Sequence, residues 1–136
     1  MKKLLTFSTI LMCTLFAIGQ TDGEAMIKSV YGDTEYNQML SSNPGKVELL
    51  EKYALYGFHV VPINDKYTTA PELTQIPLRS KSSSTISIQS FLQEYTSGNF
   101  NPLSTNLFPG SESQVYRLQG VNLVIVIDNQ SSILAH

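Results

Sequence analysis

His59 is the residue of this sequence best suited to acid–base chemistry. An imidazole can take a proton from a hydroxyl nucleophile, so His59 with Asp65, or with a serine from residues 79–90, is the basis of a small-hydrolase hypothesis. The nucleophile signal is weak, because residues 110–113 read Gly-Ser-Glu-Ser and break the Gly-x-Ser-x-Gly motif. We therefore expect His59 to be a half-buried strand residue with a local hydrogen bond, and we keep the hydrolase as an alternative.

Metal and cofactor chemistry needs ligands that this sequence does not bring together. His136 is the only other histidine, Cys13 is the only cysteine, and the acids nearest to His59 are Glu51 and Asp65. Neither acid lies at a spacing typical of metal ligands. The glycines are isolated from one another, whereas a phosphate-binding loop needs several of them before a helix. We predict no metal site and no cofactor.

Two of the seven tyrosines are candidates for contact with a partner. Tyr56 lies off the apolar stripe of a predicted helix, and Tyr67 lies in a predicted turn directly after Lys66. A tyrosine presents a large ring with a polar hydroxyl, a combination that is enriched in protein interfaces. We predict a contact face made of Tyr56, Lys66 and Tyr67, on the exterior of helix 44–56 and on the 64–67 turn.

The overall charge argues against a protein that binds nucleic acid. The 136 residues carry 9 basic and 11 acidic side chains, which gives a formal charge of −2. Proteins that bind nucleic acid need a basic patch to neutralise phosphates. Arg79 and Lys81 flank a serine-rich stretch, and two cations in such a stretch are typical of a solvated loop.

The first twenty residues have the three-part pattern of a secretory signal peptide. Two lysines provide the positive start, residues 4–18 are an uncharged apolar run, and Ala17 and Gly19 are the small residues that a cleavage site requires. The run is shorter than the roughly 20 residues that span a bilayer. We therefore expect cleavage near Gly19/Gln20, no stable membrane span afterwards, and a secreted or periplasmic location.

Removal of residues 1–19 changes the composition of the chain that remains. The product has 117 residues, no cysteine because Cys13 leaves with the leader, and a formal charge of −4 because two lysines are lost. Cys13 does not fit the lipoprotein pattern, since Met12 precedes it where a small residue is required. Residues 20–136 have the length of a single small domain. Without a disulfide, this domain must be stabilised by its hydrophobic core alone.

Two segments carry strong helix signals. For the helix predicted over residues 44–56, Asn43 is a favourable N-cap, Pro44 suits the first helical position, and Gly57 is placed as a left-handed C′ residue. For the helix predicted over residues 87–97, apolar side chains recur at spacings of three and four, and a glycine follows. Any functional side chain that does not lie on a strand has to be positioned by these two helices.

The remaining helix signals are weaker. Residues 21–31 predict a lead-in with a single helical turn, and residues 72–76, between two prolines, have room for one or two turns. Residues 33–40 predict a short helix, capped by its first residue. The side chains expected to face inward from it are Tyr36, Met39 and Leu40.

Three segments predict strands, near residues 58–63, 114–119 and 122–127. The last is apolar at every position from Leu123 to Ile127, which is typical of a central strand covered on both faces. A short loop with a glycine precedes it, so the last two strands predict an antiparallel hairpin. Together with the two helices, the strands predict an α+β fold with a small, mostly antiparallel sheet.

These observations favour an exported, non-catalytic protein that binds a partner in the cell envelope or outside the cell. The partner is a protein or another envelope component, and the sequence leaves its identity and the oligomeric state open. One alternative is the small secreted hydrolase that uses His59 with an acid or a serine. Another is a structural envelope subunit whose apolar last strand pairs with a second chain.

Overall fold

The computed structural model describes residues 22–79 and 84–136, and it has the α+β architecture predicted from the sequence. The predicted signal peptide, its cleavage position and Cys13 lie outside these residues, as do residues 80–83 of the serine-rich stretch. No helix within the described ranges is long and apolar enough to cross a membrane.

The main sheet contains the three strands that the sequence predicts, together with one that it does not. Its order is β1-β6-β5-β2, so the apolar last strand is central, with β1 and β5 antiparallel on its two sides. The backbone of this strand therefore bonds within the chain on both edges. The bounds are β1 (Phe58–Pro62), β2 (Glu72–Leu73), β5 (Gln114–Leu118) and β6 (Leu123–Ile127).

The segment between the prolines at 71 and 77 is extended, so the prediction of helical turns there is wrong. β2 pairs in parallel with β5, and β3 (Gln75–Pro77) pairs antiparallel with β4 (Thr85–Ser87) in a second, two-stranded sheet. Residues that precede a proline are biased away from the helical region. Here that bias acts at both ends of a short segment. Pairing with the distant strands β5 and β4 provides hydrogen bonds for its backbone.

The two strong helix predictions are confirmed. In α3 (Pro44–Lys52) the Asn43 side chain accepts a hydrogen bond from the Lys46 amide, and the helix continues through a π-helical turn, η1 (Tyr53–Gly57). In α4 (Ile88–Thr96) the N-cap is Ser87, whose hydroxyl accepts from the Ser90 amide. Caps of this kind satisfy amide groups that have no partner inside the helix.

Gly57 does not have the predicted left-handed conformation. The glycines with positive φ among the described residues are Gly32, Gly98 and Gly120. Gly57 is buried, and a Cβ placed on it would lie 2.7 Å from Cδ1 of Ile133. The absence of a side chain at this position lets the helix end pack closely against α5 (Gln130–Leu134).

The N-terminal part of the described chain is more helical than predicted. Residues 22–31 form a helix whose Ile27 is fully buried, and α2 (Asp33–Ser42) follows with Gly32, rather than Asp33, as its N-cap. Tyr36 and Met39 face inward as predicted, but Leu40 is 47% exposed, so its inward assignment is wrong. In two adjacent short helices, fewer side chains face the core than a single helix with a regular apolar stripe would place there.

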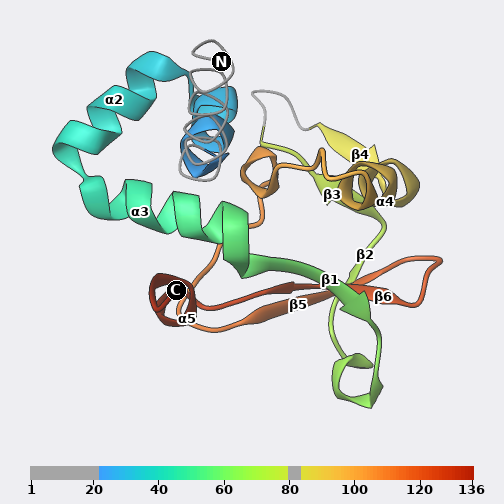
Figure 1. Cartoon of the computed structure of the whole chain (residues 1–136). Coiled ribbons are helices and arrows are strands. Elements are labelled where there is room, and N and C mark those ends of the chain that lie inside the picture. Colours follow the sequence, from blue (N-terminus) through green and yellow to red (C-terminus); the bar gives the residue numbers. More distant parts are fainter. Residues whose placement is uncertain (1–21, 80–83) are drawn as a thin grey trace, which may run out of the picture.

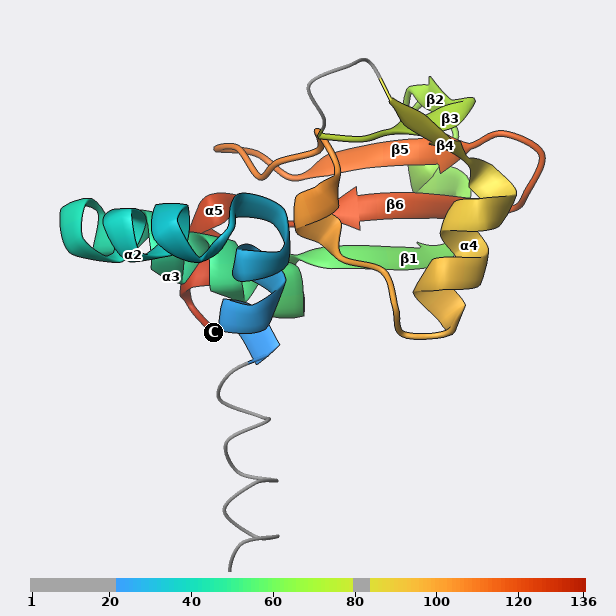
Figure 2. The same ribbon diagram turned by 90° about the horizontal axis from the view of Figure 1, so that it is seen from above.

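The core lies on one side of the main sheet. Figure 1 shows α4 and the β3–β4 pair on that side, with the 63–71 segment on the other, and Figure 2 shows α2 and α3 beside one end of the sheet. Aromatic rings link the sheet to α4: Phe91 lies 4.8 Å from Phe100 and 6.1 Å from Phe58, centroid to centroid. The irregular segment 99–113, which contains η3 (Pro102–Ser104), adds buried apolar side chains to this core.

Candidate functional site

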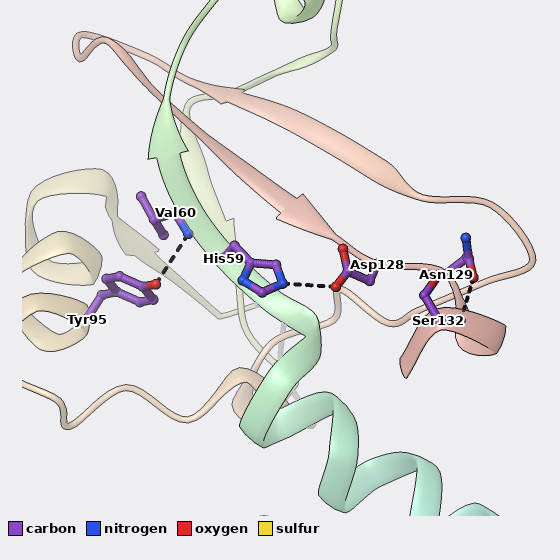
Figure 3. A network of polar contacts seen from close by, with 6 residues as sticks. All are labelled: His59, Val60, Tyr95, Asp128, Asn129 and Ser132. Carbon is purple, nitrogen blue, oxygen red and sulfur yellow. Dashed lines mark hydrogen bonds and ion pairs between the residues drawn. The ribbon is translucent and has the colours of Figure 1, made fainter. Parts of the chain in front are cut away.

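His59 lies within hydrogen-bond distance of Asp128 rather than of the predicted Asp65. Figure 3 shows the imidazole on β1 directed toward the carboxylate that follows β6, with Nε2 3.0 Å from Oδ2. The two side chains are 42% and 29% exposed. Asp65 begins the 3₁₀ turn η2 (Asp65–Tyr67), beyond the other end of β1, and no hydrogen bond or ion pair described here joins it to His59.

A carboxylate that orients an imidazole is the base half of a hydrolytic site. A nucleophile is also needed, and among the described residues no hydroxyl hydrogen-bonds to His59. Two serines of the 79–90 segment, Ser87 and Ser90, lie at the start of α4, where their hydroxyl oxygens are 3.0 Å apart. The described geometry thus supplies an oriented base without an adjacent hydroxyl partner.

Tyr56 lies at an exposed corner where η1 meets α5. Its ring is stacked on the ring of His136, with centroids 4.7 Å apart and planes at 16°, and the residue is 45% exposed. Leu134, the last residue of α5 and two residues before His136, is 42% exposed. Lys52 connects the two elements, because its Nζ donates to the Leu134 carbonyl at 3.2 Å and pairs with Glu48 at 2.9 Å. We call Lys52, Tyr56, Leu134 and His136 the Tyr56 corner.

Lys66 and Tyr67 lie at the other end of β1. Lys66 is exposed, its Nζ is 5.9 Å from the Tyr67 ring centroid, and Tyr67 is half-buried. The five residues of β1 separate this turn from Tyr56 (Figure 1). The predicted contact residues therefore occupy two separate places rather than neighbouring positions.

A cleft of about 320 Å³ lies on another side of the molecule, and sequence reasoning did not identify it. It forms where the end of helix 22–31, the first turn of α3 and the segment after β3 meet residues 105–108. The chain after β3 is held there by backbone bonds: the Arg79 amide donates to the Ser104 carbonyl at 2.7 Å, and the Asn106 amide to the Pro77 carbonyl at 3.0 Å. The described lining residues are Tyr31, Lys46, Arg79, Thr105, Asn106 and Phe108.

No model of a known family, no curated protein and no solved structure matches this chain. Within residues 22–79 and 84–136, no three His, Cys, Asp or Glu side chains lie close enough to hold a metal ion. Of the two tyrosines singled out for an exposed contact, Tyr56 is exposed and Tyr67 is half-buried. The contacts of His59 with Asp128 and of Tyr56 with His136 span 69 and 80 residues of chain.

Proposed function

We propose that the protein is exported, non-catalytic, and binds a partner protein through the Tyr56 corner. The observation that carries this proposal is the stacked pair of Tyr56 and His136, in which an exposed tyrosine ring is held in one orientation. A ring fixed before binding loses little conformational freedom when a partner packs on it. Rigid, exposed aromatic side chains are accordingly frequent at the energetic centres of interfaces.

The surroundings of this stack favour a protein partner with an apolar contact surface. Leu134, two residues before the stacked His136, is also exposed, and Lys52, which donates to the Leu134 carbonyl, pairs with Glu48. An apolar centre with a polar border is the usual arrangement of a protein interface. Because Lys52 is already paired, the corner offers a partner more apolar contact than net charge.

The proposed export is supported by the leader pattern and by the cysteine count. The only cysteine lies in the leader, so the domain that remains has no thiol to oxidise outside the cytoplasm. N-terminal sequencing of the protein from the native cells should give Gln20 as the first residue, in the secreted or periplasmic fraction. Recovery of the full N-terminus from the cytoplasm would reject export while leaving the Tyr56 corner to be tested separately.

Photo-crosslinking in the native cells tests the Tyr56 corner directly. A benzoylphenylalanine at position 56 should give a discrete covalent adduct, whereas the same probe at Gln93, exposed on α4, should not. A Tyr56→Ala variant should retain its thermal stability and lose capture of the same partner, because its ring is largely outside the core. Equal adducts from both positions, an adduct with a second copy of this chain, or no adduct would each overturn the proposal.

The hydrolase remains a second candidate because of one observation, the His59–Asp128 contact. It requires a hydroxyl nucleophile to approach Nδ1 of His59, the ring nitrogen that does not contact Asp128. Turnover of an ester substrate that is lost in His59→Gln and retained in Tyr56→Ala would favour it over the binding protein. Equal residual turnover in both variants would reject it.

A further inference from the structure

The cleft near Arg79 is a second site, independent of the Tyr56 corner, and its charge is unusual for this chain. Six basic residues are described, and three of them have carboxylate partners: Lys28 with Glu24, Lys52 with Glu48, and Arg117 with Glu72. Of the three that have none, Lys46, Lys66 and Arg79, two line the same cleft. Its described lining contains no acidic residue, although acids outnumber bases in the whole sequence.

Arg79 is held in place before any ligand arrives. Its guanidinium carbon lies 4.4 Å from the centroid of the Tyr31 ring, and its Nη1 donates to the Tyr31 hydroxyl. No contact from elsewhere in the described chain uses Nε and Nη2. This pair of donors forms the planar fork that binds both oxygens of a carboxylate or a phosphate. The stacking therefore removes side-chain freedom, and no described residue occupies the anion-binding edge of Arg79.

The other described polar residues of the cleft contribute hydrogen-bond donors, and none of them carries a negative charge. Lys46 lies in the first turn of α3, and among the described residues neither its ammonium group nor the side-chain amide of Asn106 has a hydrogen-bond or ion-pair partner. The Thr105 hydroxyl is already engaged, since it accepts from the Leu107 amide at 3.1 Å and donates to a backbone carbonyl. An arriving oxyanion would thus meet a guanidinium, an ammonium and an amide.

One wall of the cleft is aromatic. Phe108 is 39% exposed, and its other side contacts the buried Tyr53 ring with an edge-to-face centroid distance of 5.8 Å. This packing fixes the Phe108 ring beside the cationic residues. A volume of about 320 Å³ accommodates a small organic molecule as well as an inorganic ion.

We propose that this cleft binds a small organic anion, with a carboxylate or phosphate head on Arg79 and Lys46 and an apolar or aromatic body against Phe108. The head would take the free edge of the guanidinium and the Lys46 ammonium, and Asn106 would donate to the same group. The body would replace water over the exposed face of Phe108. Carboxylate and phosphate share this recognition chemistry, and probes of each kind separate them.

Binding is measured with benzoate and phenyl phosphate, followed by backbone amide shifts and titration calorimetry. At least one of them should bind and shift the amides of Arg79, Asn106 and Phe108. Benzamide, which has the shape of benzoate without its charge, should bind at least about tenfold more weakly, as should either anion to Arg79→Gln. Inorganic phosphate should also bind more weakly than phenyl phosphate, because it cannot contact Phe108.

The matched control is Lys66→Gln, which removes the third unpaired cation from a place outside the cleft. It should change the affinity by less than about twofold, since long-range charge is screened by salt. Lys46→Gln and Phe108→Ala should each weaken binding while the thermal unfolding midpoint confirms that the variants are folded. Equal affinity for benzamide and benzoate, an effect of Lys66→Gln as large as that of Arg79→Gln, or no binding of either anion would overturn the proposal. None of these results depends on the Tyr56 corner.

Discussion

The imidazole of His59 and the carboxylate of Asp128 join the beginning of β1 to the chain just after β6. The contact lies next to a backbone bond in which the Asp128 amide donates to the Gly57 carbonyl at 3.0 Å. It therefore reinforces the end of the sheet where η1 enters β1. Because both side chains are partly exposed, solvent screens the pair, and such pairs contribute little to stability.

Replacement of either partner should have only a small effect on folding. Asp128→Ala and His59→Ala should each lower the free energy of unfolding by less than about 1 kcal/mol, and the double variant should be less destabilised than the sum. Urea denaturation at low and high salt measures this coupling, which should decrease with salt. A loss well above 1 kcal/mol in either single variant would show that the pair is a major element of stability.

The open edge of β1 is protected by Tyr95. The tyrosine hydroxyl accepts a hydrogen bond from the Val60 amide at 3.3 Å, as Figure 3 shows, and Pro62 has no amide hydrogen to offer a neighbouring strand. Tyr95→Phe should therefore accelerate hydrogen exchange at the Val60 amide and increase concentration-dependent association. Tyr116→Phe is the control, since its hydroxyl donates to the Gln114 side chain rather than bonding to the β1 backbone, and unchanged exchange in Tyr95→Phe would contradict the role.

The close packing at Gly57 gives a prediction that depends on space rather than on φ. Gly57→Ala should lower the free energy of unfolding by about 1–3 kcal/mol, because its Cβ would overlap Ile133. Ile133→Val in the same chain should recover part of that loss, measured as a coupling in urea denaturation. Gly45→Ala is the control: its nearest atom is 3.8 Å away, so it should be neutral or slightly stabilising. A neutral Gly57→Ala would contradict the packing.

The parts of the fold that the sequence predicts correctly depend on neighbours along the chain. Asn43 caps its helix by accepting a hydrogen bond from an amide three residues away, and the unbroken apolar run of β6 marks it as central. The errors occur where distant partners decide. Residues 72–77 are too short to reveal a strand, and they become β2 and β3 only because β5 and β4 supply their hydrogen bonds.

The candidate sites also depend partly on neighbours along the chain and partly on distant contacts. Solvent exposure of Tyr56 follows from the period of its helix, but its stacking on His136 requires α5 to pack against η1. The Arg79 cleft is assembled from four separated segments, so no spacing in the sequence brings Lys46 to Arg79. One local signal existed, the pair of cations at 79 and 81, and it did not reveal the tyrosine beneath the guanidinium.

Glu51 should make the protein less stable at neutral pH than in mild acid. Burial raises its pKa above the ordinary value of 4.5, and the charges of Glu24 and Glu48 add to this. A raised pKa in the folded state means that the stabilising protonated form is present below 4.5 and is lost as pH rises through the folded pKa. Glu51→Gln should therefore be more stable than the wild type at neutral pH, with the gain disappearing below 4.5.

Glu94→Gln is the control for this comparison, because Glu94 is exposed on α4. Urea denaturation across the acid range measures both variants against the wild type. The gain from Glu51→Gln should be small, below about 1 kcal/mol, since the carboxylate is only partly removed from water. A gain that grows as the pH falls would have the wrong sign and would reject the assignment.

Tyr53 should lower the stability of the protein at alkaline pH. Its side chain is fully buried, its hydroxyl donates to the Leu107 carbonyl at 2.8 Å, and burial raises its pKa well above the ordinary value of 10.0. Above pH 10 the unfolded chain loses this proton while the folded chain keeps it, so stability falls as pH rises further. Tyr53→Phe cannot ionise and should lack this contribution to the alkaline fall.

At neutral pH the same substitution should cost about 1 kcal/mol, because one hydrogen bond to the Leu107 carbonyl is lost. The difference in free energy of unfolding between Tyr53→Phe and the wild type should then narrow as the pH rises above 10. Only the wild type has the Tyr53 hydroxyl, which must stay protonated in the folded chain. Tyr67→Phe is the control at neutral pH, since its hydroxyl has no hydrogen-bond partner among the described residues. Urea denaturation over this range measures the difference, and a difference that stays constant would mean that Tyr53 ionises as readily in the folded chain as in the unfolded one.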